Sequence, residues 1–354
     1  MAETGKYIYG IINSHTDFRL SLPDDFLKGE NESNNVYTVS YQEISAVVRD
    51  AEMVEYTSLR RDILGRLLVG HQNVIEKIMG LQHSILPLRL GTFAQDEIEV
   101  KDILNKGYSL IKEILEKTKD KIEIDVCVTW SDFASIIKEA GEKEEIKEFK
   151  KSLLASPQGI STDDRLRIGR MLKEQLDRKR EEYAFLIQDT LKTISLDFKN
   201  HELMDDNMVS NGAFLIEKGK KEEFENGVEK LDTEFKGQLN FRCVGPLPAY
   251  SFYTLEIKKI QFQDVDWARK RLGLLNDFVT KQDIKKAHQS MALVFHPDRN
   301  PNTPGIEKEF NEITAAYKIL WEYYLSAEQA GQIDRCSFHE EEFRKSALLV
   351  KLRD

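Results

Sequence analysis

The side chains best suited to chemistry in this chain of 354 residues are seven histidines, which are scattered along the sequence. They are His15, His71, His83, His201, His288, His296 and His339. No two of them stand at the short spacing with which a helix or loop presents zinc ligands. The sequence also has no glycine-rich phosphate loop and no nucleophile elbow. We therefore expect no enzyme activity, no metal and no cofactor.

Two of these histidines leave a choice open. His71 and His83 precede Arg89 and could form a polar cluster with it. The alternative, and the commoner use of an isolated histidine, is a structural ring that is satisfied inside the fold. The three cysteines, at positions 127, 243 and 336, are odd in number and widely spaced. They indicate no disulfide framework, which fits a reducing cytoplasm.

His296 differs from the other histidines because it opens the tripeptide His296-Pro297-Asp298 between two amphipathic segments. The segment before it carries apolar residues at helical spacing, namely Ile284, Ala287, Met291 and Phe295. The segment after it does the same with Phe310, Ile313, Ala316, Tyr317 and Leu320. Thr280 and Asp283 form a capping pair at the start of the first helix, and Pro297 ends it. The pattern predicts an antiparallel helical hairpin with the tripeptide exposed in its loop.

This stretch resembles a J domain, the module that engages Hsp70-type chaperones. The residues that carry the resemblance are Leu272-Gly273-Leu274, Ile284-Lys285-Lys286-Ala287, His296-Pro297-Asp298-Arg299-Asn300, Phe310-Asn311-Glu312-Ile313, Ala316-Tyr317 and Leu320. The resemblance implies contact with such a chaperone through Lys285, Lys286, His296, Pro297 and Asp298.

Three residues depart from the J-domain pattern, in which the helix before the tripeptide usually has a basic face. Gln289, Ser290 and Val294 stand where the family usually places Arg or Lys. Basic residues steer and orient an acidic partner surface, so their loss bears on activity more than on fold. Two readings follow: an active co-chaperone, or a J fold that serves only as a docking surface.

The bulk properties of the chain exclude several classes of protein. Its length predicts two or three domains. A formal net charge of −10 and a pI near 5.4 argue against a nucleic-acid-binding protein, which would carry a basic stripe. No run of some 18 apolar residues occurs, so we expect a soluble protein with no membrane partner.

The first 130 residues alternate strand-like and helical segments. The apolar run from Tyr7 to Ile12 is typical of a strand buried on both faces. Further segments are strands at 36–40, 44–48 and 84–90 and helices at 58–79 and 100–117. Ile122, Ile124, Val126, Val128 and Trp130 alternate with polar residues and predict a half-buried strand at 121–130. We expect an α+β sandwich with its helices on one face of the sheet.

The middle of the chain predicts a second α+β unit. Residues 131–151 are charged and helical, and the longest helix is expected at 163–198. A strand at 208–216, a helix at 220–235 and a long or broken strand at 239–257 follow. The run Gly245-Pro246-Leu247-Pro248 interrupts that last strand, because proline is confined to edges, bulges and corners of sheets.

Several of these segments, in this order, resemble the gas vesicle F/L protein family. They are Tyr7-Ile8-Tyr9-Gly10-Ile11, Pro87-Leu88-Arg89-Leu90-Gly91-Thr92, the Val126–Asp132 strand, the Gly169–Arg180 helix, Ala213-Phe214-Leu215-Ile216 and Gly245–Phe252. Leu90, Leu247 and Ala249 stand where the family often has other apolar residues. The resemblance implies a ferredoxin-like N-terminal domain, a second α/β domain around the long helix, and a role in gas vesicle formation with contact to the small hydrophobic shell protein.

These inferences combine into one hypothesis. The chain is expected to be a non-enzymatic accessory or structural protein that binds the shell protein and other gas vesicle accessory proteins in the cytoplasm, at the gas vesicle. Exposed sheet edges and aromatic residues are natural pairing surfaces for an apolar partner, and Tyr250, Phe252 and Tyr253 beside the proline corner are the contact candidates. The alternative is that these three aromatic side chains are packed in the core. The expected domains are 1–130 (ferredoxin-like), 131–260 (with the long helix) and 261–354 (J-like, with a helical tail).

Overall fold

The computed structural model describes residues 3–15, 17–21, 35–54, 56, 59–155, 160–332 and 334–353. It contains both helices and sheets, as expected for an α+β protein. The chain divides into two compact units: Met1–Lys117 with Tyr253–Asp354, and Thr118–Phe252. None of the helices in the described ranges combines the length and the hydropathy needed to cross a bilayer.

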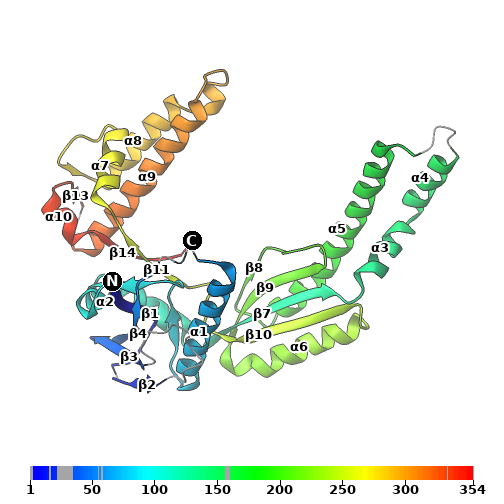
Figure 1. Cartoon of the computed structure of the whole chain (residues 1–354), viewed down its shortest axis with the longest axis horizontal. Coiled ribbons are helices and arrows are strands. Elements are labelled where there is room, and N and C mark those ends of the chain that lie inside the picture. The colour runs from blue at the N-terminus through cyan, green and yellow to red at the C-terminus, as the bar shows by residue number, and fades with distance from the viewer. Residues whose placement is uncertain are drawn as a thin grey trace. The chain divides into compact units, whose positions relative to one another are not determined.

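The first unit holds the elements at the two ends of the chain (Figure 1). Its N-terminal part comprises β1 Thr4–Ile12, β2 Arg19–Ser21, β3 Asn35–Tyr41, β4 Ile44–Glu52, α1 Arg61–Gly80, β5 Ile85–Pro87, β6 Phe93–Ala94 and α2 Glu97–Thr118. Its C-terminal part comprises β11 Leu255–Lys259, α7 Phe262–Arg271, β12 Phe278–Val279, α8 Lys281–Val294, α9 Ile306–Gln329, β13 Cys336–Ser337, α10 Glu340–Lys345 and β14 Leu348–Leu352.

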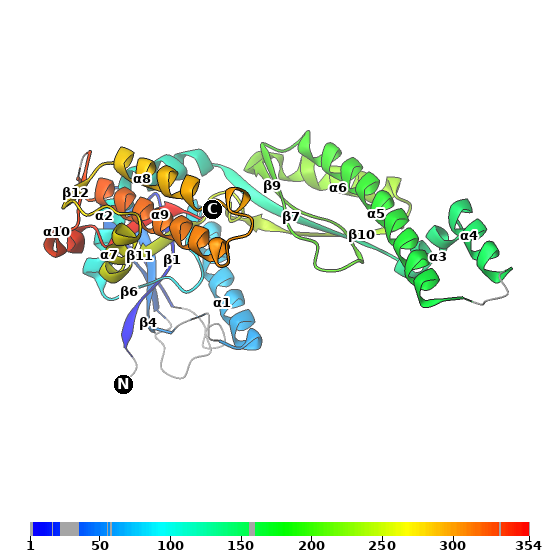
Figure 2. The same ribbon diagram turned by 90° about the horizontal axis from the view of Figure 1, so that it is seen from above.

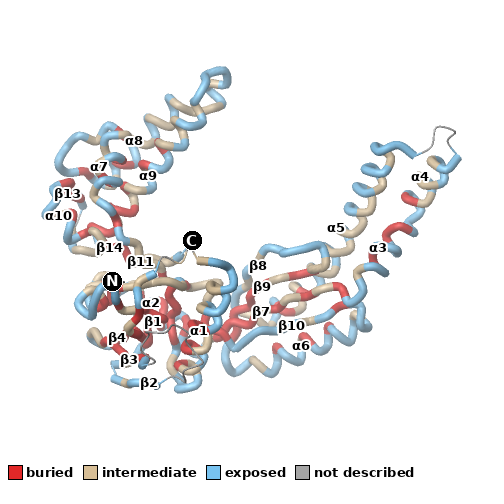
Figure 3. Tube along the Cα trace, in the orientation of Figure 1, coloured by how far each residue is buried: buried red, intermediate tan, exposed pale blue. Residues whose placement is uncertain are grey.

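The large sheet of this unit has the strand order β2-β3-β4-β1-β5, with β6 also paired to β1, and its pairs are antiparallel. Strand β1 is buried on both faces, as its apolar run predicts (Figure 3). Ile8 packs in one core cluster with α2, whereas the neighbouring Tyr7 bonds to His71 of α1. Successive side chains of a strand point to opposite faces. Helices α1 and α2 therefore cover opposite faces of the sheet, and the expectation of helices on one face is wrong.

The second unit is a four-stranded sheet with the order β10-β7-β9-β8. Its elements are β7 Lys121–Trp130, α3 Phe133–Gly141, α4 Glu144–Leu154, α5 Thr162–Lys192, β8 Asp197–Asn200, β9 Met208–Glu217, α6 Lys221–Glu234 and β10 Leu239–Leu247. Helices α5 and α6 run along this sheet (Figure 2). They pack on one of its faces, where Trp130 contacts Tyr183 of α5 and Phe214 contacts Phe224 of α6.

Two expectations for this unit differ from the structure. The sequence predicts a first domain that ends at residue 130 and so includes β7, but β7 lies between β9 and β10 in the second sheet. The longest helix ends at Lys192 rather than at residue 198, because Phe198 belongs to β8 and packs on Phe214 of β9. The long or broken strand expected at 239–257 is broken, into β10 Leu239–Leu247 and β11 Leu255–Lys259.

The C-terminal part has its own core around α7, α8 and α9, with Ile284, Ile313, Ala316 and Leu320 fully buried. Its tail is not mainly helical as expected, since α10 spans six residues and β14 follows it. The apolar run of β14 pairs antiparallel with β11. Leu348 and Val350 of β14 join the core cluster of the large sheet, whereas Leu349 joins that of the hairpin.

Candidate functional site

The helical hairpin presents His296-Pro297-Asp298 in the connection between α8 and α9, as predicted (Figure 1). The Thr280–Asp283 capping box starts α8, with both reciprocal hydrogen bonds formed. Residues Pro297–Arg299 form a single 3₁₀ turn. The Asp298 side chain is 91% exposed, and that of His296 is 44% exposed. The tripeptide is therefore accessible to a partner.

Hydrogen bonds within the loop hold the tripeptide in place. Nδ1 of His296 accepts from the backbone N–H of Asp298 at 3.1 Å, and the His296 ring lies edge-on to Phe310 of α9. The amide of Asn300 donates to the carbonyl oxygens of Val294 and His296 at 2.9 and 3.0 Å. The bond to Val294 satisfies a carbonyl at the end of α8, where a helix leaves such groups without an intrahelical partner, so the loop has a defined geometry.

The outer face of α8 changes character along its length. Lys285 and Lys286 are exposed near its start, and the Lys285 ammonium lies 5.2 Å from the ring centroid of Trp321. Gln289 and Ser290 are exposed in the middle. Leu293 and Val294, 53% and 63% exposed, end the face beside the tripeptide. The face is weakly basic at one end and apolar at the other.

Strand β10 ends near Tyr250–Phe252, a segment that is anchored to β7 by a buried carboxylate. Ser251 donates its backbone N–H and its hydroxyl to the two oxygens of Glu123, both at 2.8 Å. Burial raises the pKa of Glu123 to about 8, and the nearby Asp125 carboxylate adds to the shift. Burial also raises the pKa of Asp125. His201 lies 3.2 Å from the Ser251 hydroxyl and 3.9 Å from Asp125.

This cluster does not have the geometry of a hydrolase triad. The same nitrogen of His201, Nε2, faces both the Ser251 hydroxyl and the Asp125 carboxylate. A triad needs one ring nitrogen for the nucleophile and the other for the orienting acid. The Glu123 and Ser251 pair instead fixes the backbone of the aromatic segment.

The three aromatic candidates in this segment are half-buried rather than exposed. Phe252 lies under the Lys199 ammonium, 5.8 Å from its ring centroid. Tyr253 belongs to the other unit and packs against the core cluster of the large sheet. The site residues expected at the hairpin therefore lie together, whereas the aromatic candidates are divided between the two units.

His71, His83 and Arg89 do not form a polar cluster, because each has a different partner. His71 is buried in α1 with Nδ1 2.6 Å from the Tyr7 hydroxyl, and burial lowers its pKa to about 4. His83 stacks on Phe18, and Arg89 pairs with Glu256 at 3.0 Å. His71 is thus a structural histidine.

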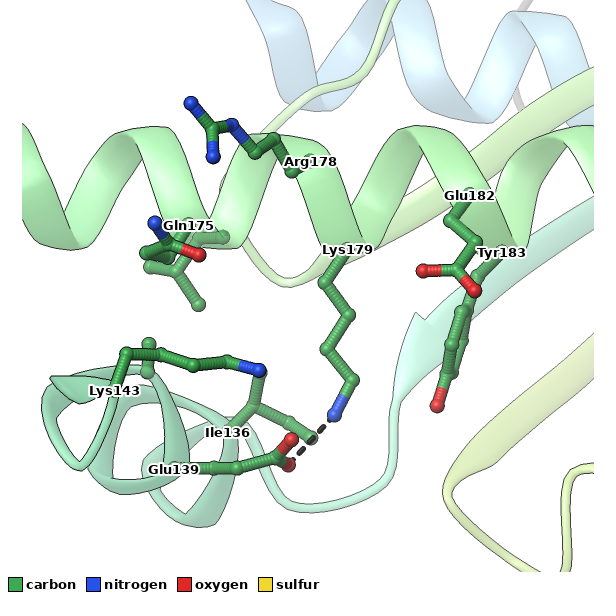
Figure 4. A pocket seen from close by; sticks show the side chains of 10 residues that line it. Ile136, Glu139, Lys143, Gln175, Arg178, Lys179, Glu182 and Tyr183 are labelled. Carbon is green, nitrogen blue, oxygen red and sulfur yellow. Dashed lines mark hydrogen bonds and ion pairs between the residues drawn. The ribbon is translucent and has the colours of Figure 1, made fainter. Parts of the chain in front are cut away.

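A cleft of about 290 Å³ lies between α3 and α5 (Figure 4). Across it Lys179 of α5 bonds to Glu139 of α3 at 2.6 Å, and the Lys179 ammonium also lies 5.5 Å from the Tyr183 ring centroid. Lys143 and Arg178 also line it, and Figure 4 shows the Arg178 side chain pointing away from α3. Its charged groups tie two helices together and include no nucleophile and base pair. Across the described part of the chain, no group of three acidic, histidine or cysteine side chains is arranged to hold a metal.

The sequence did not point to Glu123. It occupies a polar position of an alternating strand, which is ordinarily solvated, and its partner Ser251 is 128 residues away. The only signal in the sequence for a special role of Glu123 is its spacing of two residues from Asp125, which places two acidic side chains on one face of β7.

Comparisons with known proteins agree with both resemblances. The family model "Gas vesicle synthesis protein GvpL/GvpF" matches residues 5–254, and the "DnaJ domain" model matches residues 270–323. Gas vesicle protein F from Nostoc sp. is 23% identical over 251 residues, covering 70% of this chain and 98% of the relative. The chaperone protein DnaJ from Clostridium kluyveri is 50% identical over 46 residues, covering 13% of this chain and 12% of DnaJ.

Among solved structures, the crystal structure of the gas vesicle protein GvpF from Anabaena sp. is similar in fold, with a TM-score of 0.57 and 23% identity. That likeness covers 70% of this chain and 98% of the solved chain. Residues 270–323, with α8 and most of α9, form a DnaJ domain. Because the family model covers well over half of the sequence, the chain belongs to the GvpL/GvpF family of gas vesicle synthesis proteins.

Proposed function

We propose that this protein is a non-enzymatic accessory factor that binds the small hydrophobic shell protein of gas vesicles and supports vesicle assembly in the cytoplasm. The observation that carries the proposal is the match to Gas vesicle protein F over nearly the whole length of that relative. Contact with other gas vesicle accessory proteins belongs to the same proposal. So does a ferredoxin-like description of the antiparallel sheet with α2 on one face, from which α1 on the other face is a departure.

Phe252 is the leading contact residue for the shell protein, ahead of Tyr250 and Tyr253. It is half-buried, and its segment is fixed by the Ser251 bonds to Glu123, so an apolar partner would meet a preorganised ring. Tyr253 contributes to a core cluster and is less free to take part.

The test is a pull-down of the purified small shell protein by the full-length chain and by two matched variants. Phe252→Ala is expected to weaken binding about tenfold, in the range of aromatic hot-spot truncations. Phe185→Ala, which removes a 66% exposed ring from α5, is the control and should leave binding unchanged. If the wild-type chain captures no shell protein, the proposed function is contradicted. If binding is lost only with Phe185→Ala, the contact surface lies on α5 instead.

A second function, action as an Hsp70 co-chaperone, is favoured by the exposed Asp298 in a defined loop. Lys285, Lys286, His296 and Pro297 would complete the contact. The test is stimulation of the ATPase of a purified Hsp70-type chaperone. Stimulation by the wild type that Asp298→Asn abolishes would establish this activity. Equal rates with both proteins would leave the module as a docking surface.

A further inference from the structure

Strand β10 is an open edge of the second sheet. Within the described strands of that sheet it pairs with β7 alone, at one end of the order β10-β7-β9-β8. The opposite edge strand, β8, is only four residues long. An edge strand presents unpaired N–H and C=O groups on which another strand can form. In β10 these groups run from Leu239 to Val244, where a register shift and Pro246 interrupt the ladder.

The side chains of β10 alternate between two faces. One set lies on the face that α5 and α6 cover and consists of Leu239, Phe241 and Cys243. These residues stand opposite Trp130, Val128 and Val126 of β7, respectively. Those on the other face are Asn240, Arg242 and Val244, all exposed. A strand added beside β10 would meet a different surface with each of its two sets of side chains.

Helix α6 places an acidic stripe along the helix-covered side of this edge. Glu225, Glu229 and Asp232 recur at spacings of four and three and are all exposed. Glu225 pairs with Lys221 at 3.3 Å, while Glu229 and Asp232 form no ion pair among the described residues. Glu225 also acts on the edge strand itself, since burial and this carboxylate together raise the pKa of the Cys243 thiol.

A groove of about 350 Å³ joins the stripe to the edge. It is lined by Val228, Glu229, Asp232, Leu239, Asn240 and Phe241. The groove has an apolar floor, from Val228 and the ring of Phe241, and an acidic rim. Such a groove suits a lysine or arginine side chain, whose stem lies on apolar surface while its charge reaches the rim.

We propose that β10 and α6 form a docking groove for an extended protein segment that adds to the sheet as a fifth strand. The segment carries Lys or Arg on its helix-facing side, where Glu229 and Asp232 receive the charge. It carries apolar residues on the other side, where Val244 is 41% exposed and Arg242 repels a further cation. Backbone bonds supply affinity and the acidic rim supplies selectivity, as in strand addition generally.

This surface is distinct from the Phe252 contact and does not depend on the partner proposed above. The probe is a peptide labelled at its N-terminus, fluorescein-Gly-Lys-Val-Lys-Val-Lys-Val-Lys-Val-amide, which is titrated with the full-length chain and followed by fluorescence anisotropy. Glu229→Lys/Asp232→Lys is expected to weaken binding at least tenfold. The control, Glu223→Lys/Glu234→Lys, makes the same change in net charge on the opposite side of α6. It should leave the affinity within about twofold, because salt screens exposed charges that lie away from the groove.

Two further measurements separate strand addition from general charge attraction. A peptide with the second of its four Val residues replaced by Pro cannot form the ladder and is expected not to bind. Amide hydrogen exchange should slow at Leu239–Val244 of β10 when the original peptide is added, and remain unchanged in β8. No binding of the basic peptide, equal binding of the proline peptide, or equal weakening by the two double variants would each overturn the proposal.

Discussion

Replacing Val350 by Ala tests whether the DnaJ domain is built into the family domain or only attached to it. Val350 is fully buried in β14, opposite Ile257 of β11. It packs in the core cluster of the large sheet, and a Cβ on Gly107 of α2 would lie 2.7 Å from its Cγ1. Helix α2 therefore approaches β14 closely at this residue. We expect the substitution to destabilise both parts of the first unit.

The magnitude follows from the two methyl groups removed. Burial of each is worth about 0.8 kcal/mol, or about 1.6 kcal/mol together. A cavity term adds to this because packed neighbours relax only partly, and Gly107 has no side chain that could fill the space. The expected loss is about 2–3 kcal/mol. For a unit of this size that corresponds to a fall of about 5–10 °C in the melting temperature.

The assay combines thermal unfolding of the full chain with hydrogen exchange resolved by segment. Val350→Ala should speed exchange in β1 and α2 as well as in α9, since one cooperative unit loses stability together. The control, Val294→Ala, shortens a side chain that is 63% exposed and should stay within about 0.5 kcal/mol of the wild type. Faster exchange confined to residues 262–353, with β1 and α2 unchanged, would refute the reasoning.

Two further predictions concern the anchored segment and the loop. Glu123 has a folded-state pKa of about 8 against an ordinary value of 4.5, so the folded protein keeps a proton that the unfolded chain loses, and stability should fall as pH rises through that interval. The Glu123→Gln side chain cannot ionise, so the free energy of unfolding measured in urea should vary less with pH between pH 5 and 8. The control, Glu222→Gln at an exposed position of α6, should keep the pH dependence of the wild type. An unchanged pH dependence in Glu123→Gln would contradict the raised pKa of Glu123. Asn300→Ala removes the side-chain hydrogen bonds to the carbonyls of Val294 and His296 and should destabilise the loop by about 1–2 kcal/mol. The measurement is amide hydrogen exchange in the loop, which should become faster. Unchanged exchange would show that other contacts hold the loop.

Local patterns predicted the hairpin well because its determinants are close in sequence. The Thr280–Asp283 capping box and the stripe through Ile284 fix α8, and Pro297 ends it. The exposure of the tripeptide follows from these elements alone. The polarity change along the outer face of α8 was also readable in the sequence, at Gln289 and Val294.

Pairings between distant segments were not predictable from the same kind of pattern. The alternation of apolar and polar residues in β7 indicates a half-buried strand, but it is equally compatible with a place in either sheet. The partners of β7, β9 and β10, lie some 80 to 120 residues further along the chain. The continuous apolar run of β1 correctly indicated two buried faces. That run was already in conflict with helices on one face, since something must cover the second face, and α1 does so.

The position of β14 has a consequence for how this chain should be dissected. The match to the GvpL/GvpF family ends at residue 254, yet Leu348 and Val350 complete the core cluster of the family domain from outside the matched region. In the same strand Leu349 completes the core of the DnaJ domain, and Gln329 of α9 bonds to both the N–H and the carbonyl of Val350. A chain cut between the two domains would lose this strand and expose β11 and part of the α2 face. Loss of shell-protein binding by such a truncation would then report on folding rather than on recognition, and single substitutions such as Phe252→Ala and Asp298→Asn separate the two.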